Sequence, residues 1–164
     1  MKQILSKSVV LIGLMGCGKS SVGKMLSEAI GVPFSDTDNI IEKEVGKQVY
    51  QIFDDFGEKY FRQVEEKVVE RTLRDNPHII STGGGSVISP KIRELIKIKS
   101  CSIWIQCDVH MIAKRIFNQG NRPLLKHKNV LDTLIEKNED RVEFYSQADI
   151  HIKNENSKLE LVVD

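Results

Sequence analysis

The chain has 164 residues, of which 40% are hydrophobic and 29% are charged, and its formal net charge is +1. This length suits one domain with a sizeable buried core, and we expect a single domain over residues 1–164. The near-neutral charge argues against binding to nucleic acid or to a membrane surface. No stretch approaches the roughly 20 consecutive apolar residues of a membrane-spanning helix. We therefore expect a cytoplasmic protein, with a monomer as the default because no heptad pattern is visible.

Short apolar runs alternate with amphipathic stretches along the chain, which is typical of a parallel sheet with helices on both faces. The expected strands are 8–12, 33–36, 78–82, 100–106 and 148–152. The expected helices are 19–30, 37–45, 49–56, 58–73, 90–98, 110–117, 130–145 and 158–163. Ligands of such sheets bind at the carboxyl ends of the strands, so the residues that follow each strand are the first candidates for a site.

A glycine-rich loop follows the first expected strand. It reads Gly13-Leu14-Met15-Gly16-Cys17-Gly18-Lys19-Ser20 and fits G-x-x-x-x-G-K-[ST], with an amphipathic helix directly after it. In that context backbone N–H groups and the helix N-terminus surround a phosphate, the lysine reaches the terminal phosphates and the serine hydroxyl ligates Mg²⁺. The loop therefore predicts a nucleotide site. The thiol of Cys17 lies beside the expected helix N-terminus, which could lower its pKa and make it reactive. We favour the alternative, in which Cys17 occupies a variable loop position and has no chemical role.

Two carboxylates, Asp36 and Asp38, follow the second strand with one residue between them. Beside a nucleotide, one can hold Mg²⁺ through water, and the other can orient or deprotonate an attacking hydroxyl. The alternative is that Thr37 or Asp38 only caps the next helix.

The third strand is followed by Gly83-Gly84-Gly85, which lets a ligand approach the backbone. No acid ends that strand, so Asp36 is the best carboxylate for Mg²⁺.

Two further segments carry candidate cations. A mostly helical insertion between the second and third strands, about 37–75, holds Arg62 and Glu65, which are three residues apart and can pair. The fork of an arginine suits a substrate carboxylate, although a surface ion pair alone would also explain Arg62. The polar, Gly/Pro-containing stretch 118–128 is interpreted as a mobile lid, from which Arg122 could reach a transferring phosphate.

Six motifs, in order and at compatible spacing, resemble those of the shikimate kinase family across essentially the whole chain. They are Gly-x-Met-Gly-x-Gly-Lys-Ser (13–20), Asp-x-Asp (36–38), Gly-Glu-x-x-Phe-Arg-x-x-Glu (57–65), Gly-Gly-Gly (83–85), Arg-Pro-Leu-Leu (122–125) and Arg-x-x-x-Tyr (141–145). The resemblance implies a three-layer α/β/α P-loop kinase fold with a five-stranded parallel sheet in the order 2-3-1-4-5. It implies transfer of the ATP γ-phosphoryl group to the 3-hydroxyl of shikimate, with Mg²⁺ as cofactor.

The resemblance also implies roles for individual residues. The catalytic residues would be Lys19, Asp38 and Arg122. ATP would contact Gly13, Met15, Gly16, Cys17, Gly18, Lys19, Ser20, Ser21, Arg115 and Arg122, and Mg²⁺ would contact Ser20 and Asp36. Shikimate would contact Asp38, Phe53, Phe61, Arg62, Glu65, Gly83, Gly84, Gly85, Pro123, Leu124 and Arg141. In this assignment Arg62 and Arg141 bind the carboxylate, and Arg115 lies against adenine.

Three alternatives stay open on the sequence. Another small-molecule P-loop kinase, for gluconate or a nucleoside monophosphate, would share the phosphate loop. A GTPase would use Asp54-Asp55-Phe56-Gly57 as D-x-x-G, but no N-K-x-D motif is present and the segment is predicted to be helical. A nucleotide-binding module without catalysis is disfavoured, because Lys19, Asp38 and Arg122 are all present.

Overall fold

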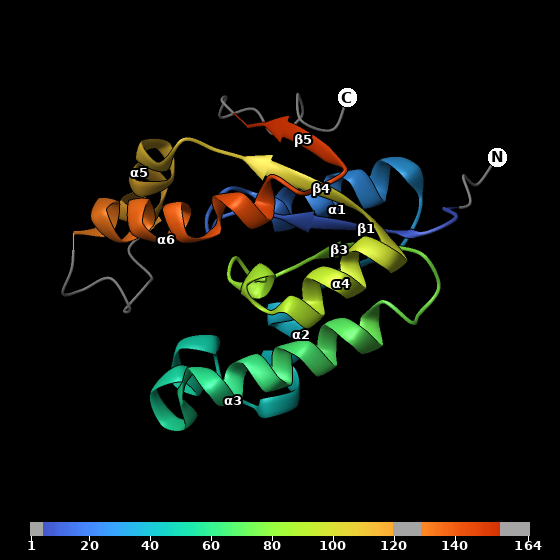
Figure 1. Ribbon diagram of the computed structural model, residues 1–164, viewed down its shortest axis with the longest axis horizontal. Helices are drawn as coiled ribbons and strands as arrows, with labels where there is room; N and C mark the ends of the chain where they lie inside the picture. The colour runs from blue at the N-terminus through green and yellow to red at the C-terminus, as the bar shows by residue number, and fades with distance from the viewer. Residues whose placement is uncertain (1–4, 120–128, 155–164) are drawn as a thin grey trace.

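A computed structural model describes residues 5–119 and 129–154 of the chain. Five parallel strands form one sheet in the order β2-β3-β1-β4-β5, with helices packed on both of its faces (Figure 1). The expected three-layer architecture and strand order are therefore confirmed. Within the described residues, no helix is long and apolar enough to cross a membrane.

The observed elements agree closely with the expected ones. The strands are β1 (Ser8–Ile12), β2 (Phe34–Asp36), β3 (Ile79–Ser81), β4 (Ser100–Gln106) and β5 (Ile150–Lys153). The helices are α1 (Lys19–Ile30), α2 (Thr37–Val45), α3 (Val49–Thr72), the 3-10 helix η1 (Ser86–Ile88), α4 (Pro90–Lys99), α5 (Val109–Gln119) and α6 (Val130–Tyr145). The expected helix 158–163 lies outside the described residues, and η1 was not predicted.

Helix α3 has a kink at Gly57, whose backbone is non-helical with φ 81° and ψ 167°. A positive φ costs glycine little because it has no Cβ atom, so the residue marks the break between the two helices expected at 49–56 and 58–73. After the kink, the second half of α3 carries Phe61, Glu65 and Val68 on its buried side. The kink therefore sets the direction of the segment that holds the Arg62 and Glu65 side chains.

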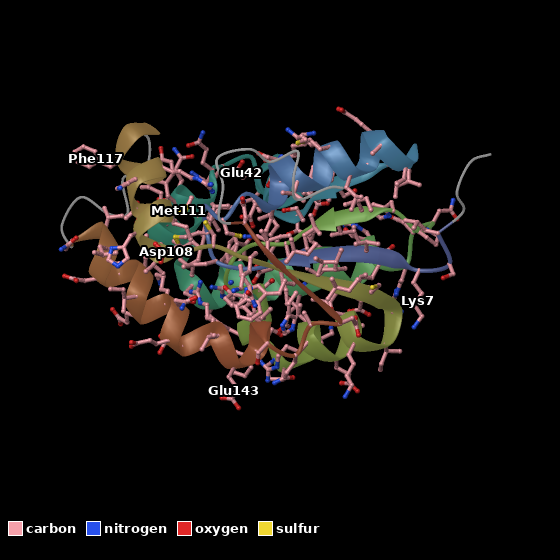
Figure 2. All side chains as sticks on the ribbon, turned by 90° about the horizontal axis from the view of Figure 1, so that it is seen from above. Lys7, Glu42, Asp108, Met111, Phe117 and Glu143 are labelled. Atoms are coloured by element: carbon pink, nitrogen blue, oxygen red, sulfur yellow. The ribbon has the colours of Figure 1, made fainter. Side chains whose placement is uncertain are left out.

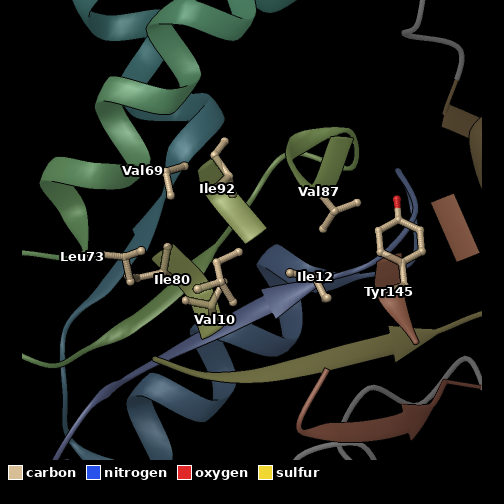
Figure 3. Close-up of a cluster of buried hydrophobic side chains, with 9 residues drawn as sticks. Val10, Ile12, Val69, Leu73, Ile80, Val87, Ile92 and Tyr145 are labelled. Atoms are coloured by element: carbon tan, nitrogen blue, oxygen red, sulfur yellow. The ribbon is translucent and has the colours of Figure 1, made fainter. Parts of the chain in front are cut away.

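Successive residues of β1 point to opposite faces of the sheet and so build two cores. Val10 and Ile12 belong to a cluster with side chains from α3, α4 and α6, including Tyr145, which lies beside Val87 and Ile12 (Figure 3). Leu11 belongs to the opposite cluster, with side chains from α1, α5 and α6. Burial on both faces explains the nearly continuous apolar sequence of this central strand.

Helix α5 packs against the outside of the phosphate loop. Its Ile112 and Ile116 are buried, and a Cβ atom at Gly16 would lie 2.9 Å from Ile112 Cγ2. Phe117, which is 84% exposed, lies at the opposite end of the molecule from Lys7 (Figure 2). The structure assigns the first two residues of the expected lid, 118 and 119, to α5, and residues 120–128 lie outside the described part.

Candidate active site

The loop between β1 and α1 holds its lysine against its own backbone. Lys19 is buried, and its Nζ donates hydrogen bonds to Gly13 O at 2.8 Å and to Leu14 O at 3.0 Å. Gly18, with φ 98°, is the N-cap of α1. A Cβ atom at Gly84 would lie only 2.8 Å from Met15 N, so the loop after β3 touches the phosphate loop directly. If an anion binds here, its oxygens can replace Gly13 O and Leu14 O as the acceptors of the Lys19 ammonium.

Hard oxygen ligands meet at the end of β2. Ser20 Oγ donates to Asp36 Oδ2 at 2.5 Å and lies 3.3 Å from Ser81 Oγ. Hydroxyl and carboxylate oxygens beside a phosphate loop fit Mg²⁺, which prefers oxygen ligands and keeps several waters and phosphate oxygens. Among the described residues no cluster of three or more His, Cys, Asp or Glu could hold a metal ion. The donor set therefore fits an ion that a nucleotide brings, rather than a cage made by protein alone.

The cap of α2 is Asp36, and not Thr37 or Asp38 as the capping alternative held. Asp36 Oδ1 accepts from Asp38 N at 3.1 Å and from Asn39 N at 3.3 Å, while its Oδ2 accepts from Ser20. The residue before the helix has an extended backbone, which lets its side chain turn back to the first free N–H groups. The Asp38 carboxylate is thereby left available for a ligand.

The glycines after β3 let charged side chains from α2 and α3 approach the backbone closely. A Cβ atom at Gly83 would lie 2.8 Å from Asp38 Oδ1 and 3.0 Å from Glu65 Oε1. One at Gly85 would lie 2.9 Å from Arg62 Nη1. Side chains at these positions would displace the charged groups, so glycine is required for close approach rather than for an unusual φ at either residue.

Two carboxyl oxygens that face Gly83 are buried and have no hydrogen-bond partner among the described residues: Asp38 Oδ1 and Glu65 Oε1. Burial, reinforced by the negative charge of Asp36, raises the pKa of Asp38 to about 6 although Lys19 acts in the opposite direction. Burial raises the pKa of Glu65 to about 7, against the effect of Arg62. A ligand with hydroxyl groups would supply the donors that these oxygens lack.

Arg62 is held in place from several sides. Its Nη1 donates to Glu65 at 2.7 Å and its Nη2 to Glu58 at 3.1 Å. The guanidinium carbon lies 5.3 Å from the ring centroid of Phe61 and 6.0 Å from that of Phe53. The expected pairing of Arg62 with Glu65 is confirmed. A surface ion pair does not describe it, because the Glu65 side chain is fully buried.

Arg141 is the most unusual cation of the site. It lies on α6, is only 5% exposed, and its Nε and Nη1 find no hydrogen-bond partner among the described residues. Its charge acts on the Glu65 carboxyl and on Tyr145, so these side chains lie near one another. A buried guanidinium with unused donors is costly unless an anion pairs with it. The arrangement therefore predicts an anionic ligand.

Of the remaining predicted site residues, some lie outside the described part of the chain and the others lie on α5 or near the phosphate loop. Arg122, Pro123 and Leu124 lie outside the described residues. Arg115 on α5 donates from Nη1 to Cys107 Sγ at 3.7 Å. Cys17 is fully buried within the core, which agrees with a passive role. Ser21 is exposed in the first turn of α1.

Three residues of the site were not in the predicted set. Ser81 ends β3 beside Ser20, and its position at a strand end could have identified it. The Tyr145 hydroxyl donates to Gly84 O, and burial raises the pKa of this tyrosine to about 12. Asn154 follows β5 and donates to Cys17 O. The last two contacts join residues far apart in sequence, and no local pattern indicates them.

Known proteins resemble this chain in sequence and in fold. The family model described as "Shikimate kinase" matches residues 15–164. A shikimate kinase of Caulobacter vibrioides is 40% identical over 148 residues, which cover 90% of this chain and 74% of that protein. One of Rhizobium meliloti is 37% identical over 99% of this chain and 85% of that protein.

Solved structures agree with this match. A shikimate kinase from Acinetobacter baumannii, solved in complex with shikimate, has a TM-score of 0.92 at 28% identity, covering 99% of this chain and 90% of that one. A gluconokinase from Sinorhizobium meliloti has a TM-score of 0.62 at 20% identity, covering 98% of this chain and 89% of that one, and shows a common fold alone. The chain belongs to the shikimate kinase family.

Proposed function

We propose that this protein transfers the γ-phosphoryl group of ATP to the 3-hydroxyl of shikimate, giving shikimate 3-phosphate and ADP. The observation that carries the proposal is the set of groups beside the phosphate loop. Arg62 and the carboxyl oxygens of Asp38 and Glu65 that lack partners among the described residues gather over the glycines after β3, and the buried Arg141 guanidinium acts on the Glu65 carboxyl. This set is complementary to a small acceptor with one carboxylate and several hydroxyls.

On the nucleotide side, the loop and helix α1 bind the triphosphate, and Lys19 turns from Gly13 O and Leu14 O to the terminal phosphates. Ser20 and Asp36 would hold Mg²⁺, and the ion would supply positive charge to the phosphate oxygens. Arg115 lies against the adenine in this proposal. In this proposal Arg122, in the expected lid at about 118–128, adds positive charge at the transferring phosphate.

On the acceptor side, Arg62 and Arg141 bind the carboxylate and so fix the direction of the ring. Phe53 and Phe61 contact its apolar edge. Asp38 Oδ1 accepts a hydrogen bond from the reacting hydroxyl, orients its oxygen toward the phosphorus and takes up its proton. Because phosphoryl transfer depends mainly on position and charge, this alignment is the chief contribution of the acceptor site. In this proposal the insertion at about 37–75 binds the acceptor.

The rate is expected to depend on the ionisation of Asp38. Its pKa is raised to about 6, so below that pH the carboxyl is protonated and cannot accept the hydrogen bond from the acceptor hydroxyl. We expect kcat/KM for shikimate to fall about tenfold per pH unit on the acid side of about pH 6. The measurement is a pH profile at subsaturating concentrations of both substrates. A flat profile from pH 5 to 7 would contradict the role of this carboxylate.

We also propose that the protein is cytoplasmic and that it is a monomer. Three cysteines are too few to suggest the disulfide framework of a secreted protein, and the sequence shows no heptad pattern that would favour association. Size-exclusion chromatography with light scattering tests the second proposal.

The decisive test is ADP release by the purified full chain with Mg·ATP and, in turn, shikimate, gluconate and a panel of nucleoside monophosphates. We expect turnover with shikimate alone. Turnover with gluconate or a nucleotide would support the nucleotide role of the phosphate loop but would contradict the assignment of the acceptor site to shikimate. No turnover with any acceptor, together with Mg·ATP binding, would favour the nucleotide-binding module.

A further inference from the structure

Asn154 is a fully buried polar residue that the proposed reaction does not use. It directly follows β5, at the far edge of the sheet from β2. Its backbone N donates to Gln106 O, the last residue of β4, at 2.6 Å. Its side-chain Nδ2 donates to Cys17 O in the phosphate loop at 3.0 Å, across 137 residues of sequence. The side chain thus joins the outer edge of the sheet to the loop that follows β1.

The contact fixes one peptide plane of the loop. A trans peptide is planar, and its C=O and N–H point in opposite directions. When Cys17 O is held outward by Asn154, the N–H of Gly18 must point to the other side, where helix α1 begins. The Cys17 N–H is already used by Leu14 O at 3.2 Å. The Gly18 N–H shares its peptide plane with Cys17 O, so its direction depends on the contact of that oxygen with Asn154.

Without the Asn154 contact, the local sequence would not fix the orientation of the Cys17–Gly18 peptide. Gly18 has a positive φ of 98°, and glycine adopts either sign of φ at similar cost, so the torsion angle of Gly18 does not by itself select one orientation of the 17–18 peptide. Rotation would turn Cys17 O toward the phosphate site and Gly18 N–H away from it. An anion would then meet a carbonyl oxygen instead of a donor.

We propose that Asn154 is a positioning residue that holds the Cys17–Gly18 peptide with its N–H toward the triphosphate. The proposal rests on the proposed use of ATP at this loop. The probes are Mg·ATP and Mg·tripolyphosphate, which has no base or sugar. With calorimetry on the full chain, we expect Asn154→Ala to weaken both by about tenfold, as for a lost buried hydrogen bond, and to leave shikimate affinity unchanged.

Two further variants separate the causes. Asn154→Asp has the same shape but places a carboxylate oxygen against Cys17 O, and we expect a larger loss than with alanine. Asn76→Asp adds the same charge at an exposed residue and should change neither affinity. Asn154→Ala introduces no buried charge, so it keeps the measurement possible if the aspartate variant does not fold.

Each outcome has a distinct meaning. Tripolyphosphate affinity equal to wild type in Asn154→Ala would overturn the proposal, even if the unfolding temperature fell, because the role would then be structural. Loss of ATP affinity with normal tripolyphosphate affinity would also overturn it and indicate a contact with the nucleoside. A wild-type chain that binds neither triphosphate would reject the proposed function together with this inference.

Discussion

Replacing Asp38 with asparagine is expected to lower kcat by about 10²- to 10⁴-fold, the range typical of a lost general base. The substitution keeps the shape of the side chain but removes the charge and the proton acceptor. Oδ1 of Asp38 is buried, has no partner among the described residues and faces Gly83, so an acceptor hydroxyl is its natural partner. Steady-state ADP release at saturating Mg·ATP and shikimate gives kcat, and calorimetry gives the Mg·ATP affinity.

The Mg·ATP affinity of the asparagine variant should stay close to that of wild type, because Asp36, and not Asp38, lies beside Ser20. The matched control is Asp54→Asn, which makes the same change at an exposed position of α3. It should leave both kcat and affinity unchanged. If Asp38→Asn turned over at a near-normal rate, Asp38 would be neither the base nor the group that orients the acceptor.

Replacing Arg141 with alanine is expected to raise the Kd for shikimate by about 30- to 700-fold, which corresponds to about 2–4 kcal/mol for loss of one partner of a buried charge pair. Arg141 is 5% exposed and two of its nitrogens lack partners among the described residues. The proposal assigns the substrate carboxylate to these donors. Calorimetric titration with shikimate measures the loss directly.

Two companion variants make the result specific. Arg141→Lys keeps the charge but not the planar fork, and we expect it to recover only part of the affinity. Arg74→Ala removes an exposed arginine of the same charge and should leave shikimate affinity unchanged. A variant at Arg141 that lost Mg·ATP affinity instead of shikimate affinity would place this arginine on the nucleotide side and refute the assignment.

Much of the fold was predictable because its signals are local. The phosphate loop was visible from the spacing of Gly13, Gly18 and Lys19 after an apolar run. The bounds of β1, β4, α1, α2 and α6 follow from apolar periodicity and from end residues such as Gly31, which closes α1 with φ 69°. The break in α3 was expected at Gly57, and α4 is capped by Ser89, a residue type that is favoured at this position. Short-range sterics and hydrogen bonds decide these features wherever the segment lies.

The arrangement of the site depends on contacts that no local pattern specifies. The sequence by itself determined which residue types follow each strand, and hence that Asp36, Asp38 and the glycines at 83–85 would gather at one sheet edge. Only the tertiary structure decided that Asp36, beyond its local role as the cap of α2, would accept a hydrogen bond from Ser20, and that Asn154 would contact Cys17. It also decided that Arg141 would be buried with two nitrogens that no other described residue accepts from. The reason is that these distances depend on sheet order and helix packing, which fix side chains far apart in sequence to within a few ångströms.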